Sequence, residues 1–371
     1  MKYRIPQVNP FFDDKEKTYL AKAIESRWIT EGPFAADFLE AIKTITGAEY
    51  AVLAPNGTLG LYLALVAGGV TAGEVIVPDF TFNASAAAVV FAGARPVFVD
   101  VRPSDLNLDP EKIEAAITPR TRAIMPVHVY GQSCDMATII EIAGQHGLLV
   151  IEDAAQSLGV FYHQRHTGVI GDAGVISFFA DKVITTGEGG VVLTNNAGIY
   201  EKLRYLRNQG RMKSGTFVHP SLGLNFRMTD LQCAVGLAQI EKFQDIVAAR
   251  VNHYRRYESL LGGIDQVRFL ARNSFCNMVP FRVPLIVEQL PGLIDFLESR
   301  GIQTQRFFFP LHRQPCYHYD GIAENAFARS DNAYNNGLLL PVFSALTEAQ
   351  IEYICRQVAE FYGIGFKTDE T

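Results

Sequence analysis

Residues 148–156 read LLVIEDAAQ, and this segment gives the clearest indication of the fold. Four apolar residues run without alternation into Glu152 and Asp153, and small and polar residues follow. A short continuous apolar run of this kind is typical of a strand that is buried on both faces, as the strands of a parallel sheet are. Gly147, just before the run, is suited to end a helix there. We therefore predict a buried strand that presents polar side chains at its carboxyl end.

Similar runs lie on both sides of this strand, between about residues 50 and 195. The six runs are AVLA at 51, EVIV at 74, PVFVDV at 96, AIMPVHV at 123, VISFF at 175 and GVVLT at 190. Helical or loop segments separate them, and Asp109 with Pro110 supplies an N-cap and a first-turn proline for one such helix. The alternation predicts an α/β fold with a mostly parallel, seven-stranded sheet covered by helices.

The pattern changes beyond residue 195, where it first becomes helical. Thr229 and Gln232 have the spacing of a capping box at the start of a helix. From about residue 250 strands and helices mix, and the segment PGLIDFLESRG predicts a helix that ends at Gly301. We predict a large α/β domain with an N-terminal arm at residues 1–248 and a small α+β C-terminal domain at residues 249–371.

Composition limits the classes of function that the chain can have. A chain of 371 residues, 48% of them hydrophobic, can bury a substantial core. A net charge of −6 without a basic tract argues against a nucleic-acid partner. The N-terminal segment holds charges and prolines, and no stretch approaches the roughly 20 apolar residues of a membrane span. We expect a cytoplasmic globular protein without a membrane partner.

The five cysteines are scattered along the chain, with no CxxC pair and no histidine at zinc-ligand spacing. We interpret them as reduced side chains and expect no metal site. The glycine-rich segment TTGEGG, at residues 185–190, lacks the preceding strand and following helix of a dinucleotide-binding GxGxxG motif. A nicotinamide cofactor is therefore not indicated.

Polar residues follow several of the predicted strands, at the sheet edge where parallel α/β folds bind ligands. Asp153 ends one strand, Lys182 follows VISFF, and Gly57 and Thr58 follow AVLA. Each residue alone also has a purely structural interpretation. An acidic residue at a strand end can cap a helix, a lysine can be a solvated surface charge, and Gly57 with Thr58 can simply turn the chain into a helix.

Their combination matches what a pyridoxal-phosphate (PLP) site requires. The cofactor needs a lysine amine to form an imine, an acid opposite the pyridine nitrogen, and amide and hydroxyl groups around the phosphate. A helix that begins at Gly57 and Thr58 offers free N–H groups to a phosphate. Asp153 can keep the pyridine nitrogen protonated, and Phe82 can stack on the ring. We predict that Lys182 carries the cofactor.

The segment SFFADKVITTGEGG, at residues 177–190, resembles the cofactor-lysine segment of the DegT/DnrJ/EryC1/StrS family of sugar-nucleotide aminotransferases. Further similar segments cover nearly the whole chain in the family's order: WITEGPF (28–34), PNGTLGLYLAL (55–65), VPDFTFNASAAAVVFAGARPVFVDV (77–101), ITPRTRAIMPVHVYGQSCDM (117–136), VIEDAAQSLG (150–159), GLNFRMTDLQCAVGLAQIEKF (223–243) and FFPLHRQPCY (308–317). The resemblance implies the PLP-dependent transferase fold type I, the aspartate-aminotransferase-like fold. It has a seven-stranded large domain and a small C-terminal domain, in agreement with the strand count.

The resemblance also implies roles for individual residues around the cofactor ring. Lys182 becomes the Schiff-base lysine and proton shuttle, and Asp153 becomes the partner of the pyridinium. Gln156 lies beside the phenolic oxygen of the ring, and Phe82 stacks on its face. PLP would cycle with pyridoxamine 5'-phosphate in the half-reaction.

The phosphate group has its own implied set of ligands. Gly57, Thr58 and Ser177 would hold it from one chain. Asn225, in the segment GLNFRM, would reach it from the other subunit of a homodimer with shared active sites.

The implied activity is transfer of an amino group, from glutamate, to a nucleotide-linked keto sugar for amino-sugar, O-antigen or other glycan biosynthesis. Within the family the chain is most similar to perosamine-synthase-like enzymes, which aminate C4 of a GDP-linked 4-keto-6-deoxy sugar; a dTDP- or UDP-linked sugar stays open. Trp28, Arg227 and His312, with the loop at 211–224, are candidates for substrate contact. The family often has arginine and proline before FxPxH, whereas this chain has Gln305 and Arg306, so no substrate role is carried over to Arg306.

Two other functions are compatible with this fold. A PLP-dependent sugar dehydratase has the same fold, but such relatives carry histidine at the lysine position, and Lys182 therefore favours amination. A non-catalytic binding or regulatory protein on this fold would not need the full set Asp153, Gln156, Ser177 and Lys182.

Overall fold

The computed structural model describes residues 3–211, 217–317 and 325–366. All seven predicted strands are present, and they form one sheet in the order β1-β9-β8-β5-β4-β2-β3. Their bounds are Tyr50–Ala54 (β1), Glu74–Pro78 (β2), Arg95–Val99 (β3), Thr121–Ile124 (β4), Leu149–Asp153 (β5), Ala173–Ser177 (β8) and Gly190–Thr194 (β9). The strand LVIED, from which the fold was inferred, lies in the middle of the sheet, and the α/β prediction is confirmed.

The direction of the strands determines where the polar strand ends meet. β5 pairs in parallel with both β4 and β8, and β2 pairs in parallel with β3 and β4. β9 runs against its two neighbours, β1 and β8, so β1 has the same direction as β8. The carboxyl ends of β1, β2, β4, β5 and β8 therefore lie at one edge of the sheet. Parallel α/β sheets bind their ligands at this edge.

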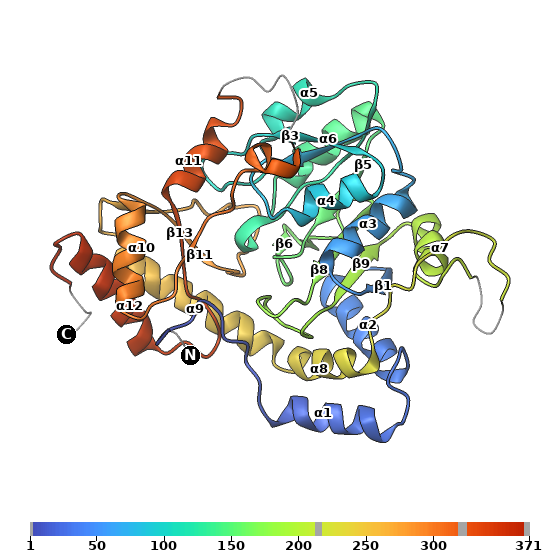
Figure 1. The fold of residues 1–371 in the computed structure, drawn as a ribbon, viewed down its shortest axis with the longest axis horizontal. Coiled ribbons are helices and arrows are strands. Elements are labelled where there is room, and N and C mark those ends of the chain that lie inside the picture. The colour runs from blue at the N-terminus through green and yellow to red at the C-terminus, as the bar shows by residue number, and fades with distance from the viewer. Residues whose placement is uncertain (1–2, 212–216, 318–324, 367–371) are drawn as a thin grey trace.

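Helices cover both faces of the sheet (Figure 1). Side chains alternate along each strand, so that Val175 packs toward one layer and Ile176 toward the other. The first layer contains α3 (Gly57–Gly68), α4 (Ala84–Phe91) and α7 (Ala197–Leu206). The second contains α2 (Pro33–Thr46), α6 (Met136–His146) and α8 (Asp230–Ile240), with α5 (Ile113–Ala116) near α6. α1 (Asp14–Glu25) packs on α8.

Several predicted helix boundaries are confirmed. The Thr229 hydroxyl accepts from the Gln232 N–H, and the Gln232 side chain accepts from the Thr229 N–H, which makes the predicted capping box of α8. Asp109 caps the 3-10 turn η1 (Pro110–Lys112), which leads into α5. Gly147 ends α6 with a φ of 63°, and Gly301, with a φ of 77°, follows the helix at Leu290–Ser299.

The C-terminal part of the chain forms a second, antiparallel sheet in the order β10-β11-β13-β12. Its strands are Val267–Phe269 (β10), Val283–Val287 (β11), Gln305–Arg306 (β12) and Gly337–Leu340 (β13). The helices α9 (Phe243–Leu261), α10 (Leu290–Ser299) and α12 (Glu348–Phe361) pack their apolar faces on it, and α11 (Ala328–Asn336) contacts β11 and β13. The remaining short elements are η2 (Val129–Gly131), β6 (Phe161–Tyr162), β7 (Arg165–His166), η3 (Leu311–Arg313) and η4 (Pro315–Tyr317).

Two features connect this C-terminal unit to the rest of the chain. The predicted domain boundary between residues 248 and 249 falls inside α9, which runs unbroken from Phe243 to Leu261. Ile5 pairs with Ile302 and is fully buried in the core of the C-terminal unit. The division at residues 248 and 249 stays a prediction.

No helix within the described residues is long and apolar enough to cross a membrane. Those residues also contain no cluster of three or more His, Cys, Asp or Glu that could hold a metal ion. The five cysteines are free thiols.

Candidate active site

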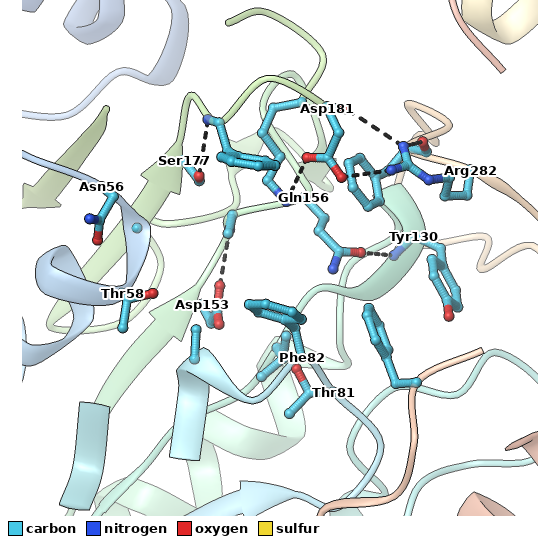
Figure 2. A pocket seen from close by; sticks show the side chains of 18 of the residues that line it. Asn56, Thr58, Thr81, Phe82, Tyr130, Asp153, Gln156, Ser177, Asp181 and Arg282 are labelled. Carbon is cyan, nitrogen blue, oxygen red and sulfur yellow. Dashed lines mark hydrogen bonds and ion pairs between the residues drawn. The ribbon is translucent and has the colours of Figure 1, made fainter. Parts of the chain in front are cut away.

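A cavity of about 360 Å³ opens at the carboxyl edge of the large sheet. This volume is in the range of small-molecule sites. Segments that follow β1, β2, β4, β5 and β8 line it on one side, and Phe281, Arg282, Gln305, Phe308 and Leu339 from the C-terminal unit line it on the other. In Figure 2, Asn56 and Thr58 lie at one end, Tyr130 and Arg282 at the other, and Asp153 and Phe82 between them.

The end of the cavity near β1 is built by the start of α3. The side chain of Asn56 caps this helix by accepting from the Leu59 N–H at 2.9 Å. The first N–H groups of a helix have no partner within it, and they carry the positive end of the helix dipole. Gly57 and Thr58 stand at this start, and Ser177 ends the nearby strand β8. The arrangement offers amide and hydroxyl donors to an anion such as a phosphate.

Asp153 lies at the centre of the cavity floor, at the end of β5. Its Oδ1 accepts from the Ala155 N–H at 3.1 Å, and its Oδ2 accepts from the Ser85 hydroxyl at 2.7 Å. Burial raises the pKa of Asp153, and the hydrogen bond from Ser85 and the charge of Lys182 only partly oppose that rise. A cationic ligand group beside Asp153 would therefore be stabilised by a buried carboxylate that is already held in position.

Gln156 and Phe82, for which the family resemblance implies contact with the cofactor ring, also line the cavity. The Gln156 Oε1 accepts from the Tyr130 N–H at 2.9 Å, which fixes the orientation of the amide. Tyr130 has a φ of 55°, in the left-handed region, and its ring stacks on Phe308. Phe82 is 61% exposed, and its ring is directed into the cavity (Figure 2). An aromatic ring exposed to this degree inside a pocket is suited to stack on a flat ligand.

Lys182 follows β8 and lies close to charged and aromatic groups. Its Nζ is 3.4 Å from the Asp181 Oδ1 and 4.4 Å from the centre of the Phe281 ring. Burial lowers the pKa of Lys182, and the charge of Arg282 lowers it further, whereas Asp181 and Asp153 act in the opposite direction. The net decrease raises the fraction of neutral amine, which is the nucleophilic form.

Other predicted residues lie outside this cavity in the single chain. Asn225 is exposed, Arg227 is partly buried, and Trp28 is 59% exposed and donates from its indole N–H to the Glu31 carbonyl. Part of the predicted substrate loop, at residues 212–216, lies outside the described residues.

His312 is held by an acidic residue rather than directed into the cavity. Its Nδ1 is 2.8 Å from the Asp79 Oδ2, and its backbone N–H donates to the Asp79 Oδ1 at 2.7 Å. The guanidinium of Arg306 lies 5.9 Å from the centre of the Tyr334 ring, while the adjacent Gln305 lines the cavity. Consecutive residues of a strand point in opposite directions, so Gln305 lines the cavity and Arg306 does not.

Several polar or aromatic residues around Asp153 and Lys182 are not indicated by the sequence. Ser85 holds Asp153, and Asp181, Phe281 and Arg282 surround Lys182. Asp181 was visible in the sequence, but an acid beside a lysine is usually a solvated pair. The segment of Phe281 and Arg282 reaches Lys182 only through the tertiary fold.

The comparisons with known proteins agree with this geometry. The model of the DegT/DnrJ/EryC1/StrS aminotransferase family matches residues 10–359. GDP-perosamine synthase of Caulobacter vibrioides is 40% identical over 95% of this chain and 96% of that protein. The enzyme of the same name from Escherichia coli O157:H7 is 36% identical over 98% and 99%.

The solved structures include DesV of S. venezuelae in complex with a ketimine intermediate, with a TM-score of 0.90, 31% identity, and coverage of 96% of this chain and 98% of that one. The family match extends over the strands, the cavity and most of the C-terminal unit. The chain belongs to the DegT/DnrJ/EryC1/StrS aminotransferase family.

Proposed function

We propose that this protein carries PLP on Lys182 and transfers an amino group from glutamate to a keto sugar linked to a nucleotide. Aminotransfer is the activity of the family to which the chain belongs. The relatives named GDP-perosamine synthase support a GDP-linked 4-keto-6-deoxy sugar as the acceptor. The observation that carries the proposal is that Lys182, Asp153 and the start of α3 line one cavity.

The groups around the cavity fit PLP in chemistry and in number. The start of α3, the Thr58 hydroxyl and the Ser177 hydroxyl can hold its phosphate. Asp153 can pair with the protonated ring nitrogen, and this pairing would lower the cost of keeping that carboxylate ionised in a buried place. Phe82 can cover one face of the ring, and Gln156 can donate its amide N–H toward the ring oxygen while its carbonyl holds Tyr130.

When bound, PLP supplies an electron sink that stabilises negative charge on a substrate carbon. The chain itself supplies proton transfer, because the Lys182 amine, with its lowered pKa, can accept a proton and return it. Asp153 keeps a negative charge at the cavity floor, where its two hydrogen bonds fix it. Phe281 and Phe308 give an apolar surface to the side of the cavity formed by the C-terminal unit.

We also propose a homodimer in which each cavity is completed by the partner chain. Asn225 is exposed in the segment between α7 and α8, which extends beyond α7 in Figure 1. Phe217 and Leu222 of the same segment are 90% and 94% exposed, and Trp28 and Ile29 are also exposed. Apolar side chains exposed in this number are typical of a protein interface. The proposal therefore assigns Asn225 to the partner's cavity.

Absorption spectroscopy and product analysis test the activity. Purified protein should show a visible cofactor band, and glutamate alone should convert that band without any sugar present. A panel of GDP-, dTDP- and UDP-linked 4-keto sugars should then regenerate it, with the GDP-linked sugar reacting fastest. Mass spectrometry of the product separates amination from dehydration, because only amination introduces nitrogen. A protein whose band does not respond to glutamate would contradict the proposal.

A further inference from the structure

The carboxylate of Asp181 lies between two cations at the edge of the cavity. Its Oδ1 is 3.4 Å from the Lys182 Nζ, and its Oδ2 is 2.6 Å from the Arg282 Nη2. The Oδ1 atom is buried and accepts no hydrogen bond from any residue that the structure describes. Asp181 therefore has one oxygen fixed by Arg282, as Figure 2 shows, and a second oxygen available to an N–H of Lys182.

The position of Arg282 is itself well determined. Its side chain is 4% exposed, its Nη1 donates to the Phe281 carbonyl at 2.9 Å, and its guanidinium lies 4.1 Å from the centre of the Phe281 ring. The amine of Lys182 lies over the same ring at 4.4 Å. A buried guanidinium that donates to a carboxylate and to a carbonyl has little freedom to move.

A second arginine fixes the backbone of Lys182 to the same segment. The buried guanidinium of Arg250 donates to the Pro280 carbonyl at 3.1 Å and to the Lys182 carbonyl at 3.4 Å. The backbone of Lys182 and the segment that carries Arg282 are thus held together. These buried contacts therefore fix the distance between the Asp181 carboxylate and the Lys182 amine, which would vary in an ion pair on a mobile surface.

We propose that Asp181 is a positioning residue that binds the Lys182 amine whenever this amine is not bonded to the cofactor, with Arg282 fixing the carboxylate. The inference rests on the proposed function. Only a lysine that alternates between a bond to the cofactor and a free amine needs a partner for the free amine. Asp181 stabilises the protonated amine, and the like charge of Arg282 destabilises it. The two groups thus have opposite effects on the proton affinity of one atom.

Labelling of lysine amines with acetic anhydride measures this effect directly, because only the neutral amine reacts. The full-length protein is labelled under saturating glutamate and, separately, after dialysis to remove the cofactor. The peptide that contains Lys182 is followed by mass spectrometry, and the exposed Lys202 in the same digest is the internal reference.

At pH 7 we expect Asp181→Asn to increase the labelling rate of Lys182 about tenfold. Arg282→Gln should decrease it by a similar factor, because Asp181 then acts on the lysine alone. Asp181→Glu, which keeps the charge, should restore a rate near that of the wild type. The matched control is Asp295→Asn, which makes the same change at an exposed position of α10 and should leave the rate unchanged.

The inference is supported if the labelling rate of Lys182 rises in the Asp181→Asn protein and falls in the Arg282→Gln protein. Changes of the rate in the same direction indicate only a loosened structure and overturn it. If Arg282→Gln does not fold, the labelling rates of Lys182 in the Asp181→Asn and Asp181→Glu proteins test the inference. Equal rates in these two proteins overturn it. The cofactor-free series does not depend on the proposed function. If glutamate does not change the labelling rate of Lys182 in the wild-type protein, the proposed function is contradicted. The test of Asp181 in the cofactor-free protein remains valid.

Discussion

Gly57 lies directly against Ser177 at the end of the cavity assigned to the phosphate. A Cβ atom on Gly57 would be 3.0 Å from the Ser177 Cβ and 3.3 Å from its Oγ, closer than side chains normally pack. The start of α3 and the end of β8 approach each other this closely because position 57 has no side chain. Their donors can therefore converge on one small anion.

Gly57→Ala should weaken cofactor binding without unfolding the protein. The added methyl group displaces Ser177 by a few tenths of an ångström and separates the donors, so we expect the Kd for PLP to rise about tenfold, or about 1.4 kcal/mol. Fluorescence titration of the cofactor-free protein measures it. Gly144→Ala is the matched control, because a Cβ there meets no atom within 4 Å and cofactor affinity should not change.

Lys182→Arg should fold and retain noncovalent cofactor, but turnover should fall by several orders of magnitude. A guanidinium stays protonated at neutral pH and cannot form the imine or shuttle the proton. Steady-state kinetics, together with a count of cofactor per chain, check this outcome. Turnover close to that of the wild type would contradict the assignment of Lys182 as the residue that carries the cofactor.

Asp153→Asn should reduce activity much more than cofactor content. An amide can contact the ring nitrogen but cannot stabilise its positive charge. Each unit by which the pKa of the ring nitrogen falls corresponds to about 1.4 kcal/mol less preference for the protonated ring. Ser85→Ala removes one hydrogen bond to Asp153 and leaves its charge, so a smaller loss, of about 1–2 kcal/mol in activation free energy, is expected. An unchanged spectrum and rate in Asp153→Asn would reduce this residue to a strand-end cap.

Mixing two defective chains tests the shared site. A chain with Lys182→Arg and a chain with Asn225→Ala should form hybrid dimers on co-expression. One of the two sites then has both native residues, and the other has both defects. We expect activity to recover to about half of the wild-type value per hybrid dimer. Verified hybrids of two folded variants that recover no activity would return Asn225 to a structural role before α8.

His312 should make stability depend on pH. Burial alone would lower the pKa of His312, but the hydrogen bond and charge of Asp79, with Asp331, outweigh burial and raise it. A raised pKa stabilises the fold fully below the unfolded value of about 6.5, and this contribution is lost as pH rises through the folded pKa. The difference in unfolding free energy between the wild type and His312→Gln should therefore be larger at pH 6 than at pH 9.

Denaturant titrations at the two pH values measure this difference. His146→Gln, at a partly exposed histidine of α6, is the control and should show a smaller change between them. The comparison stays at pH 6 and above because burial also raises the pKa of Asp79, and protonation of that carboxylate at lower pH would weaken the pair.

The sequence predicted the parts of the fold that local patterns determine. The seven strands, the capping box at Thr229 and the helix end at Gly147 each depend on residues that are neighbours in the chain. Strand direction then brought Asp153, Gly57 and Ser177 to one edge. Asp153 and Gly57 could be named in advance because each lies at the carboxyl end of a recognisable strand, whereas the role of Ser177 was implied by the family resemblance.

The remaining parts of the site depend on contacts between distant segments. Arg282 and Ser85 carry no local signal, since their partners Asp181 and Asp153 are far away in the sequence. Glu152 is a further case. It is completely buried and accepts from the N–H groups of Gly168, Ile170 and Gly171, although its position in the strand LVIED suggested only an acidic strand end.

The pairing of Ile5 with Ile302 affects the order in which the chain folds during synthesis. The Gln7 N–H donates to the Gln303 side chain at 2.9 Å, and Ile5 packs in the same core as Leu338 and Ile354. On the ribosome, Ile5 and Gln7 must therefore wait for partners that are synthesised much later. Non-local contacts of this kind slow folding and leave apolar surface exposed meanwhile. A bulky fusion immediately before Ile5 would therefore hinder the last folding step rather than the formation of the large sheet.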